Sequence, residues 1–321
     1  MKYYITADGG GTKLIVILFD ENFHILRSVR TAGTNSCFKP VEQIVKETEA
    51  LCDELFSGEI AEKVTEIEAL DCSIVGDREI LIRALSRHVK LLKCQSWGEG
   101  NVALGAAGVT HGCVAQAGTG SDAFLIQPDY NDVVGGWGAL LGDEGSGYDI
   151  GLHTLKAAIY ARDGRGPASR ILPILLEKWN MKNLWEMVGK TVNNPDSRRL
   201  VASASYITEL AADEGDEAAL AIYAHAGHEL ARQVNTVLSK HPGPIVGPIV
   251  TSGGAWKGSG KMFETFAEEV GALHPDCTIM YPIFEPVVGG VVLRLFSEGK
   301  AFADYEAVLR TEFKEFLYRH K

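Results

Sequence analysis

The sequence predicts an α/β protein built from two sheet-centred domains. Short apolar runs typical of buried strands alternate with stretches of helical periodicity, which is the pattern of α/β folds. In addition, a strand, a glycine-rich turn and a returning strand occur twice, once around Gly9 and again around Gly118. We therefore expect a duplicated β-hairpin core with one copy in each domain.

The first domain is expected to open with three antiparallel strands followed by a helix. Residues 3–8 and 14–20 have strand character on either side of a glycine turn, and residues 25–29 follow a short, mostly polar turn. The unbroken apolar run at 14–20 indicates a strand buried on both faces. Residues 41–56 carry apolar side chains at helical spacing directly after Pro40, a residue that suits the start of a helix.

The second half of the chain repeats this opening and then becomes mainly helical. Residues 113–117 and 123–126 have strand character around the second glycine turn. Helical spacing then extends from residue 149 to about residue 239 and is clearest at 217–238. Residues 244–250 predict a buried strand with its entry loop.

The domain boundaries follow from the two hairpin copies. We place the first domain at residues 1–111 and the second at residues 112–300. An amphipathic helix predicted at 304–318 is expected to join the first domain.

Composition and charge exclude several functions. The formal net charge is −11 and the sequence pI is about 5.3, which argues against nucleic-acid binding because that needs a dense Lys/Arg surface. No segment approaches the ~18 consecutive apolar residues of a membrane-spanning helix. The N-terminal residues also lack the apolar region of a signal peptide. We expect a cytoplasmic protein without nucleic-acid or membrane partners.

Cysteines and histidines give no strong metal signal. The six cysteines are scattered without a CxxC pair, so free thiols in a reducing compartment are favoured over disulfides. His225 and His228 lie three residues apart in a predicted helix. That spacing suits a metal ion, but such pairs are more often ordinary core or surface histidines.

The first glycine turn carries the most informative chemistry. Asp8 ends the first predicted strand, and the turn continues with Gly9, Gly10, Gly11, Thr12 and Lys13. Without Cβ atoms the backbone can approach an anion closely, with its N–H groups directed at phosphate oxygens. Thr12 adds a hydroxyl donor, Lys13 a positive charge and Asp8 a carboxylate that suits Mg²⁺, through water. The alternative is a plain glycine hairpin; the motif is neither a Walker loop nor a GxGxxG turn.

Two further glycine segments strengthen this interpretation. The second hairpin turns at Gly118, Thr119, Gly120 and Ser121. A buried strand is followed by Ser252, Gly253 and Gly254, with a helix expected next. Such a position suits close approach of an adenosine or its α-phosphate. Two glycine turns on duplicated halves would together clamp one polyphosphate between the domains.

The order of four motifs, DGGGTK, AGTGS, GGWGALLGDEGSG and SGGAWKG, resembles the BadF/BadG/BcrA/BcrD ATPase family. The family includes N-acetylglucosamine kinase and lies within the superfamily of actin, hexokinase and the heat-shock chaperone ATPases. The resemblance extends from Ile5 to about Leu295, where residues 286–290 are similar to a late helix-opening motif. It implies a ribonuclease-H-like (actin-like ATPase) fold in each domain, ATP and Mg²⁺ in a cleft between them, and phosphoryl transfer.

The resemblance also implies residue roles. Residues 8–13 match the first phosphate motif, residues 118–121 the second and residues 252–254 the adenosine motif. Substrate-binding positions are implied for Asn35, Thr119, Asp143 and Glu144. The alternatives are a loop cap for Asn35 and a solvated turn for Asp143 and Glu144.

One position departs from the family pattern. Similar sugar kinases usually carry an Asp, often within Asn-Asp-Ala, that orients or deprotonates the acceptor hydroxyl; here Glu99 falls at the matching place and Gly100 follows it. A carboxylate persists with one extra methylene, and ~1 Å of misplacement can cost about a hundredfold in rate. We therefore expect either a retreated backbone or a different acceptor. The alternative is that Glu99 is a surface residue beside a glycine turn.

Phosphoryl transfer depends mainly on positioning and charge stabilisation, so these parts suffice for a kinase. The leading hypothesis is an ATP-dependent kinase of N-acetylglucosamine or a related amino sugar, with Glu99 and Asp143 as catalytic residues and Asp8 at the metal. One alternative is an ATPase that activates a partner enzyme, like the family's iron–sulfur activators; Cys113 lies in a predicted buried strand with no second ligand evident. Another is a non-catalytic sugar or nucleotide sensor. The sequence leaves the sugar and the oligomeric state open, a homodimer included.

Overall fold

The computed structural model describes residues 1–36, 39–192, 194 and 197–321, and the chain separates into two compact units. Unit 1 comprises residues 1–110 and 282–318, and unit 2 comprises residues 111–281 and 319–321. The predicted 112–300 domain thus differs from unit 2, because residues 282–300 pack with unit 1. The described residues contain no helix long and apolar enough to span a bilayer.

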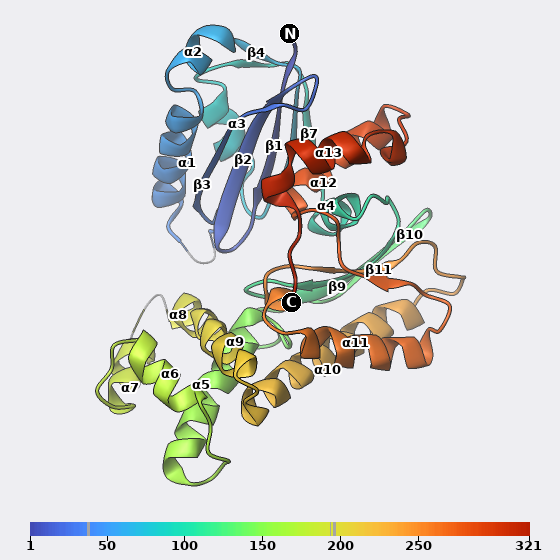
Figure 1. The fold of residues 1–321 in the computed structure, drawn as a ribbon. Helices are drawn as coiled ribbons and strands as arrows, with labels where there is room; N and C mark the ends of the chain where they lie inside the picture. Colours follow the sequence, from blue (N-terminus) through green and yellow to red (C-terminus); the bar gives the residue numbers. More distant parts are fainter. Residues whose placement is uncertain (37–38, 193, 195–196) are drawn as a thin grey trace. The chain divides into compact units, whose positions relative to one another are not determined.

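Unit 1 is a mixed sheet with helices on both faces (Figure 1). Its sheet order is β3-β2-β1-β5-β7, with β1 antiparallel to β2 and parallel to β5. The sheet strands are β1 (Tyr3–Gly9), β2 (Lys13–Asp20), β3 (Ile25–Ala32), β5 (Ala69–Ile74) and β7 (Cys94–Ser96), and a separate pair is β4 (Glu66–Ile67) with β6 (Lys90–Leu91). The helices are α1 (Val41–Leu55), α2 (Glu59–Lys63), α3 (Glu79–Leu85), α4 (Glu99–Ala106), α12 (Pro286–Ser297) and α13 (Glu306–Glu312).

Side-chain alternation along β2 explains why both faces of this sheet are covered. Leu14, Val16 and Leu18 point to a core that includes α1, whereas Ile15 and Ile17 point to a second core that includes α12 and α13. After its first residue every residue of β2 is buried, as the unbroken apolar run predicted.

Unit 2 repeats the same topology. Its order is β10-β9-β8-β11-β12, in which β8 is antiparallel to β9 and parallel to β11. The strands are β8 (Gly112–Ala117), β9 (Ser121–Gln127), β10 (Tyr130–Gly135), β11 (Ile249–Ser252) and β12 (Ile279–Met280). The helices are α5 (Gly147–Asp163), α6 (Ile171–Lys178), α7 (Trp185–Thr191), α8 (Ser197–Ser203), α9 (Ser205–Asp213), α10 (Glu217–Ser239) and α11 (Gly260–Leu273). The duplicated hairpin predicted from the sequence is therefore present in both units.

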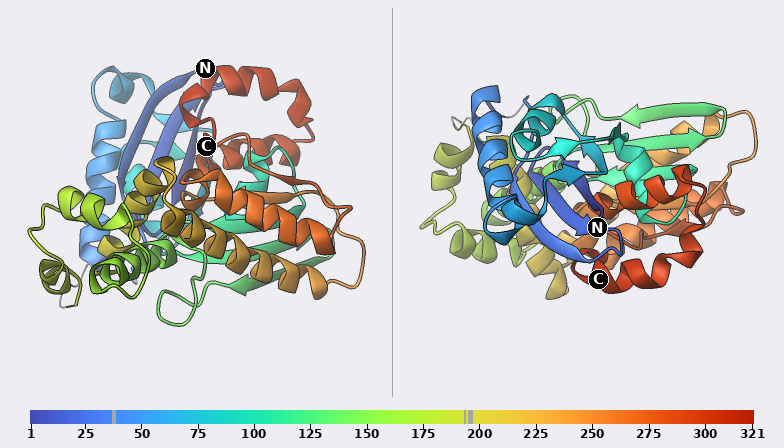
Figure 2. Two further views of the ribbon diagram at one scale, coloured as in Figure 1. Left: turned by 60° about the horizontal axis from the view of Figure 1, so that its bottom comes forward. Right: turned by 90° about the horizontal axis from the view of Figure 1, so that it is seen from above.

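Local signals set the ends of the long helices in unit 2. The Asp216 side chain caps α10 by accepting a hydrogen bond from the Ala219 N–H, and Ser146 caps α5 in the same way through the Asp149 N–H. Gly164, at a φ of 72°, ends α5 in a left-handed conformation. Figure 2 shows α10 and α11 side by side, and their backbones meet at Gly227, where a Cβ would collide with the Met262 carbonyl.

The C-terminal segment differs from the single helix predicted at 304–318. Only α13 is α-helical, flanked by short 3₁₀ turns at Phe302–Asp304 and Lys314–Phe316. Leu317 forms a β-bridge with Phe284, and the Tyr318 N–H donates to the Ile283 carbonyl. These bonds need extended backbone, so the helix cannot continue to residue 318.

A close contact between two helices fixes α4 on unit 1. The backbones of α4 and α12 touch where Gly105 faces Gly289, and a Cβ on Gly289 would collide with the Val102 carbonyl oxygen. The glycines of the late motif therefore have a packing role, because they let α12 approach the helix that begins at Glu99.

This contact predicts opposite effects for two Gly→Ala substitutions inside helices. Gly289→Ala should lower the free energy of unfolding by about 1–3 kcal/mol, the usual cost of overpacking. Gly271→Ala in α11 is the control, because a Cβ on Gly271 would meet nothing within 4 Å. It should stabilise the protein by roughly 0.5–1 kcal/mol through helix propensity. Denaturant unfolding of both variants tests this, and equal effects would contradict the packing role.

Candidate functional site

The first glycine turn is the tip of the β1–β2 hairpin in unit 1. The Gly10 N–H donates to the Lys13 carbonyl at 2.9 Å, which closes the tip beyond the last strand pair. A Cβ on Gly10 would meet nothing within 4 Å, so this backbone faces open space. A Cβ on Gly33, in contrast, would collide with the Gly10 and Gly11 backbone. The tip is thus supported from one side and open to a ligand on the other.

The segment that carries Asn35 is held against this tip. The Thr34 N–H donates to the Gly10 carbonyl at 3.0 Å, and Thr34 Oγ1 donates to the Val75 carbonyl at 2.9 Å. The Val75 N–H donates in turn to the Gly9 carbonyl at 2.7 Å. Because the residue before Asn35 is fixed to the hairpin in this way, Asn35 lies beside the predicted phosphate motif rather than in a remote loop.

Acidic groups surround the end of β1. Burial raises the pKa of Asp8 to about 7, Lys13 opposes the shift, and the negative charges of Glu99 and Glu285 add to it. Lys13 Nζ lies 3.9 Å from Glu285 Oε2. Loss of water also raises the pKa of Glu99, although the residue as a whole is exposed. Carboxylate oxygens are the ligands Mg²⁺ prefers. These residues therefore fit a divalent cation.

A buried ion pair positions the chain just before Glu99. Asp71 is 1% exposed; its Oδ2 lies 3.0 Å from Arg294 Nε, and its Oδ1 accepts a hydrogen bond from the Trp97 indole N–H at 3.1 Å. The Arg294 guanidinium stacks 4.0 Å over the Tyr4 ring. Burial raises the pKa of Asp71 to about 6, an effect that Arg294 partly offsets. The network ties α12 and β5 to the turn from which α4 starts.

In unit 2 the second glycine turn packs against the Asp143 loop. The Gly118 N–H donates to the Gly120 carbonyl at 2.9 Å, and the Gly147 N–H donates to the Gly118 carbonyl at 2.8 Å. The Tyr148 N–H also donates to the Thr119 carbonyl at 3.3 Å. A Cβ on Gly120 would stand about 3 Å from the Asp143 carboxylate. The hairpin tip and the start of α5 thus form one substructure.

Asp143 is the most constrained residue of this substructure. It is 2% exposed and has a φ of 60°, an uncommon conformation for a residue with a side chain that is often found at functional sites. Its Oδ2 accepts a hydrogen bond from an Arg198 Nη at 2.7 Å, and the Ser121 N–H points to its Oδ1 at 3.4 Å. Burial raises the pKa of Asp143, and Arg198 opposes that shift.

Glu144 is held differently from Asp143. Its carbonyl accepts hydrogen bonds from Ser121 Oγ at 2.7 Å and from Gln233 Nε2 at 3.1 Å, whereas its side chain is exposed. The carboxylates of these two neighbours therefore face different surroundings, one buried with a cation and one in solvent.

The third glycine segment contacts the second hairpin. A Cβ on Gly253, whose φ is 104°, would collide with the Ala117 carbonyl at the start of the glycine turn. Gly254 faces open space, and Ser252 Oγ is buried with no hydrogen-bond partner in the described part of the chain. A short 3₁₀ turn, Ala255–Lys257, comes before α11, so the expected helix starts later than the motif.

The predicted residues thus gather in two groups. Unit 1 holds residues 8–13, Asn35 and Glu99, and unit 2 holds residues 118–121, Asp143, Glu144 and 252–254. Sequence reasoning missed Glu285 and Arg198. Glu285 stands directly before the late motif at 286–290, which was a usable signal, but Arg198 pairs with Asp143 across 55 positions.

Cys113 is fully buried in β8, and burial raises the pKa of its thiol well above its usual range.

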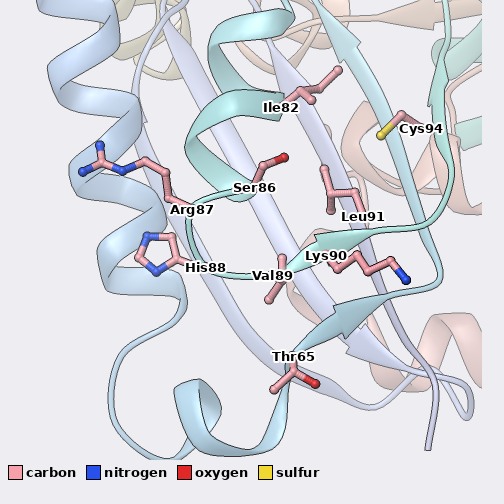
Figure 3. A pocket seen from close by; sticks show the side chains of 9 residues that line it. All are labelled: Thr65, Ile82, Ser86, Arg87, His88, Val89, Lys90, Leu91 and Cys94. Atoms are coloured by element: carbon pink, nitrogen blue, oxygen red, sulfur yellow. The ribbon is translucent and has the colours of Figure 1, made fainter.

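A cavity of about 580 Å³ lies elsewhere in unit 1 (Figure 3). It is lined by Thr65, Ile82, residues 86–91 and Cys94. Its cationic side chains have acidic partners, with Arg87 2.6 Å from Glu49 and Lys90 3.3 Å from Glu66. None of the predicted site residues lines this cavity.

Comparisons with known proteins agree with the family resemblance that the sequence motifs indicated. The model of the BadF/BadG/BcrA/BcrD ATPase family fits residues 7–293. An N-acetylmuramic acid/N-acetylglucosamine kinase from Clostridium acetobutylicum is 26% identical over 91% of this chain and 98% of its own length. An N-acetyl-D-glucosamine kinase from Dictyostelium discoideum is 25% identical over 92% and 99%. A Porphyromonas gingivalis structure, described as a candidate N-acetylglucosamine kinase, has a TM-score of 0.68 at 17% identity and covers 92% of this chain and 99% of that one. This likeness confirms the predicted fold class.

The raised pKa of Asp8 predicts a pH-dependent effect of Asp8→Asn on stability. The unfolded chain releases this proton near the ordinary pKa of 3.8, whereas the folded chain keeps it to about 7. Wild-type stability should therefore lose a contribution as pH rises from about 4 to 7. Asp8→Asn, a mimic of the protonated form, should avoid that loss.

Thermal unfolding at several pH values in EDTA measures this difference. The melting temperature of Asp8→Asn minus that of wild type should grow from pH 4 to pH 7 and then level off. Asp304→Asn, at an exposed carboxylate of the same unit, is the control. A pH-independent difference for Asp8→Asn would contradict the burial of its charge.

Proposed function

The chain belongs to the BadF/BadG/BcrA/BcrD ATPase family, and from this membership we propose that it is an ATP-dependent kinase of N-acetylglucosamine or a related amino sugar. The relatives named as such kinases match more than nine-tenths of the chain and nearly all of their own length. The observation that carries the proposal is the acidic group around Asp8 and Glu99 beside an open glycine hairpin tip.

We assign the glycine backbone to the phosphate oxygens of the nucleotide and the acidic side chain of Asp8 to its cation. In unit 1 the open tip at Gly10, with Thr12 and Lys13, supports contact with phosphate oxygens. In unit 2 the turn at 118–121 and the open backbone at Gly254 are suited to further phosphate oxygens and to the adenosine. A divalent cation held by Asp8 would offset negative charge on the phosphates.

Glu99 is the residue we assign to the acceptor hydroxyl. The sugar oxygen attacks the γ-phosphorus as its proton passes to the Glu99 carboxylate, and the bond from the γ-phosphorus to the β–γ bridging oxygen breaks to release ADP. The raised pKa of Glu99 makes it a better proton acceptor than a glutamate with the ordinary pKa. Asn35, Thr119, Asp143 and Glu144 are assigned to sugar hydroxyls, with the buried charge of Asp143 balanced by Arg198 until a ligand binds.

Nucleotide binding should depend on the open space at Gly10. Gly10→Val adds a side chain where the protein itself has no neighbour within 4 Å, so the fold should persist while phosphate approach is blocked. ATP with Mg²⁺ should raise the melting temperature of wild type by mass action but not that of Gly10→Val. Gly271→Val, at an open position in α11, controls for the added side chain and should keep the shift.

Glu99→Gln tests the catalytic assignment. It keeps the size of the side chain but removes the basic oxygen, so sugar-dependent ADP formation should fall by ~10²–10⁴. ATP affinity should change little. Glu79→Gln is the matched control, because Glu79 is also the first residue of a helix in unit 1.

Glu99→Asp is the informative companion variant. If Glu99→Asp is more active than wild type towards N-acetylglucosamine, the longer native side chain serves a different acceptor. If Glu99→Asp is inactive, the surrounding backbone has adapted to Glu. Equal rates for wild type, Glu99→Gln and Glu99→Asp would refute the catalytic role of Glu99.

A further inference from the structure

A cluster of metal-ligand side chains lies behind the Asp143 loop in unit 2. Asp149 and His153 are four residues apart on α5 and therefore share one face of that helix. His225 reaches them from α10. One ligand atom from each residue, a carboxylate oxygen or an imidazole nitrogen, lies within 4.8 Å of the other two.

The nitrogen–oxygen distances in this cluster are longer than those of hydrogen bonds and close to those between ligands of one metal ion. His153 Nε2 lies 3.5 Å from Asp149 Oδ1, and His225 Nε2 lies 3.7 Å from Asp149 Oδ2. Both distances exceed the ~2.7–3.2 Å of ordinary N–H···O bonds. Tetrahedral ligands at about 2.0–2.2 Å from Zn²⁺ stand roughly 3.3–3.6 Å apart. The two imidazole rings are tilted by 56° with centroids 4.6 Å apart, so they are not stacked.

Neighbouring groups already hold the carboxylate in place. Asp149 Oδ2 accepts a hydrogen bond from the Gly145 N–H at 3.0 Å. Supporting hydrogen bonds of this kind orient the ligands of protein metal sites. The charges of Lys156 and Glu229 also act on the pKa of His153, and Glu229 lies 2.8 Å from Arg232. The three side chains are only 16–39% exposed, so they are partly shielded while a ligand can still enter.

We propose that Asp149, His153 and His225 bind a divalent transition metal of the Zn²⁺ class, with water in the fourth position. Two imidazoles and one carboxylate suit Zn²⁺ better than Mg²⁺, which prefers oxygen ligands. The ion would join the first two turns of α5 to α10. Through Asp149 and the Gly145 N–H it would also stiffen the loop that carries Asp143. The metal-site proposal does not rest on the proposed kinase function.

Zinc titration of the full-length, untagged protein after EDTA treatment tests this proposal. We expect one tight equivalent of Zn²⁺, measured by calorimetry, and a rise in melting temperature. Loss of a residue that only supports a metal ligand weakens metal binding ~10–100-fold. His153→Gln and His225→Gln each remove a ligand itself, so each should weaken Zn²⁺ binding by more than that. His228→Gln is the matched control on α10, since its Nδ1 lies 2.8 Å from Glu269 Oε2, and it should bind like wild type.

A second measurement needs no variant. In NMR spectra of wild type, one equivalent of Zn²⁺ should shift the ring signals of His153 and His225 and leave those of His228 in place. Absence of tight zinc binding, unchanged ring signals, or retention of binding in both His→Gln variants would each overturn the proposal.

Discussion

The two glycine hairpins depend on backbone contacts that only glycine permits. In unit 1 Gly33 presses against the backbone of Gly10 and Gly11, and in unit 2 Gly253 presses against the carbonyl of Ala117. Any side chain at these two positions would push a second segment away from the hairpin tip. The contacts place Asn35 beside the first tip and residues 252–254 beside the second, so side chains distant in sequence meet the same ligand-facing backbone.

Buried charge is the second constraint, and Asp8 differs in this respect from two other buried carboxylates, Asp71 and Asp143. Asp71 is neutralised inside the protein by Arg294, and Asp143 by Arg198. At Asp8, Lys13 opposes the effects of burial, Glu99 and Glu285, yet the pKa stays raised to about 7. An unbalanced acidic group is costly for folding alone, so its persistence agrees with a site that a cation and a polyphosphate complete.

Local sequence patterns predicted most of the strands and helices. The features that they did not predict depend on contacts between residues far apart in the sequence. The strands around both glycine turns and the helix at 217–239 follow from apolar spacing and turn residues, which act over a few positions. The placement of α12 in unit 1 depends on glycine-to-backbone contact with α4 across more than 180 positions. Arg198 was missed for the same reason, and His225 was compared with His228 although its structural neighbours are Asp149 and His153. Sequence periodicity carries no record of such partners.

The most direct test of the kinase assignment is the identity of the phosphorylated product. Phosphorus NMR of the wild-type protein with ATP, Mg²⁺ and N-acetylglucosamine, alongside a panel of related amino sugars, follows every phosphate in the mixture. The account predicts that ADP and a sugar phosphate appear together in equal amounts for at least one amino sugar. ADP with only inorganic phosphate, whichever sugar is present, would contradict it and would favour an ATPase that serves a partner protein.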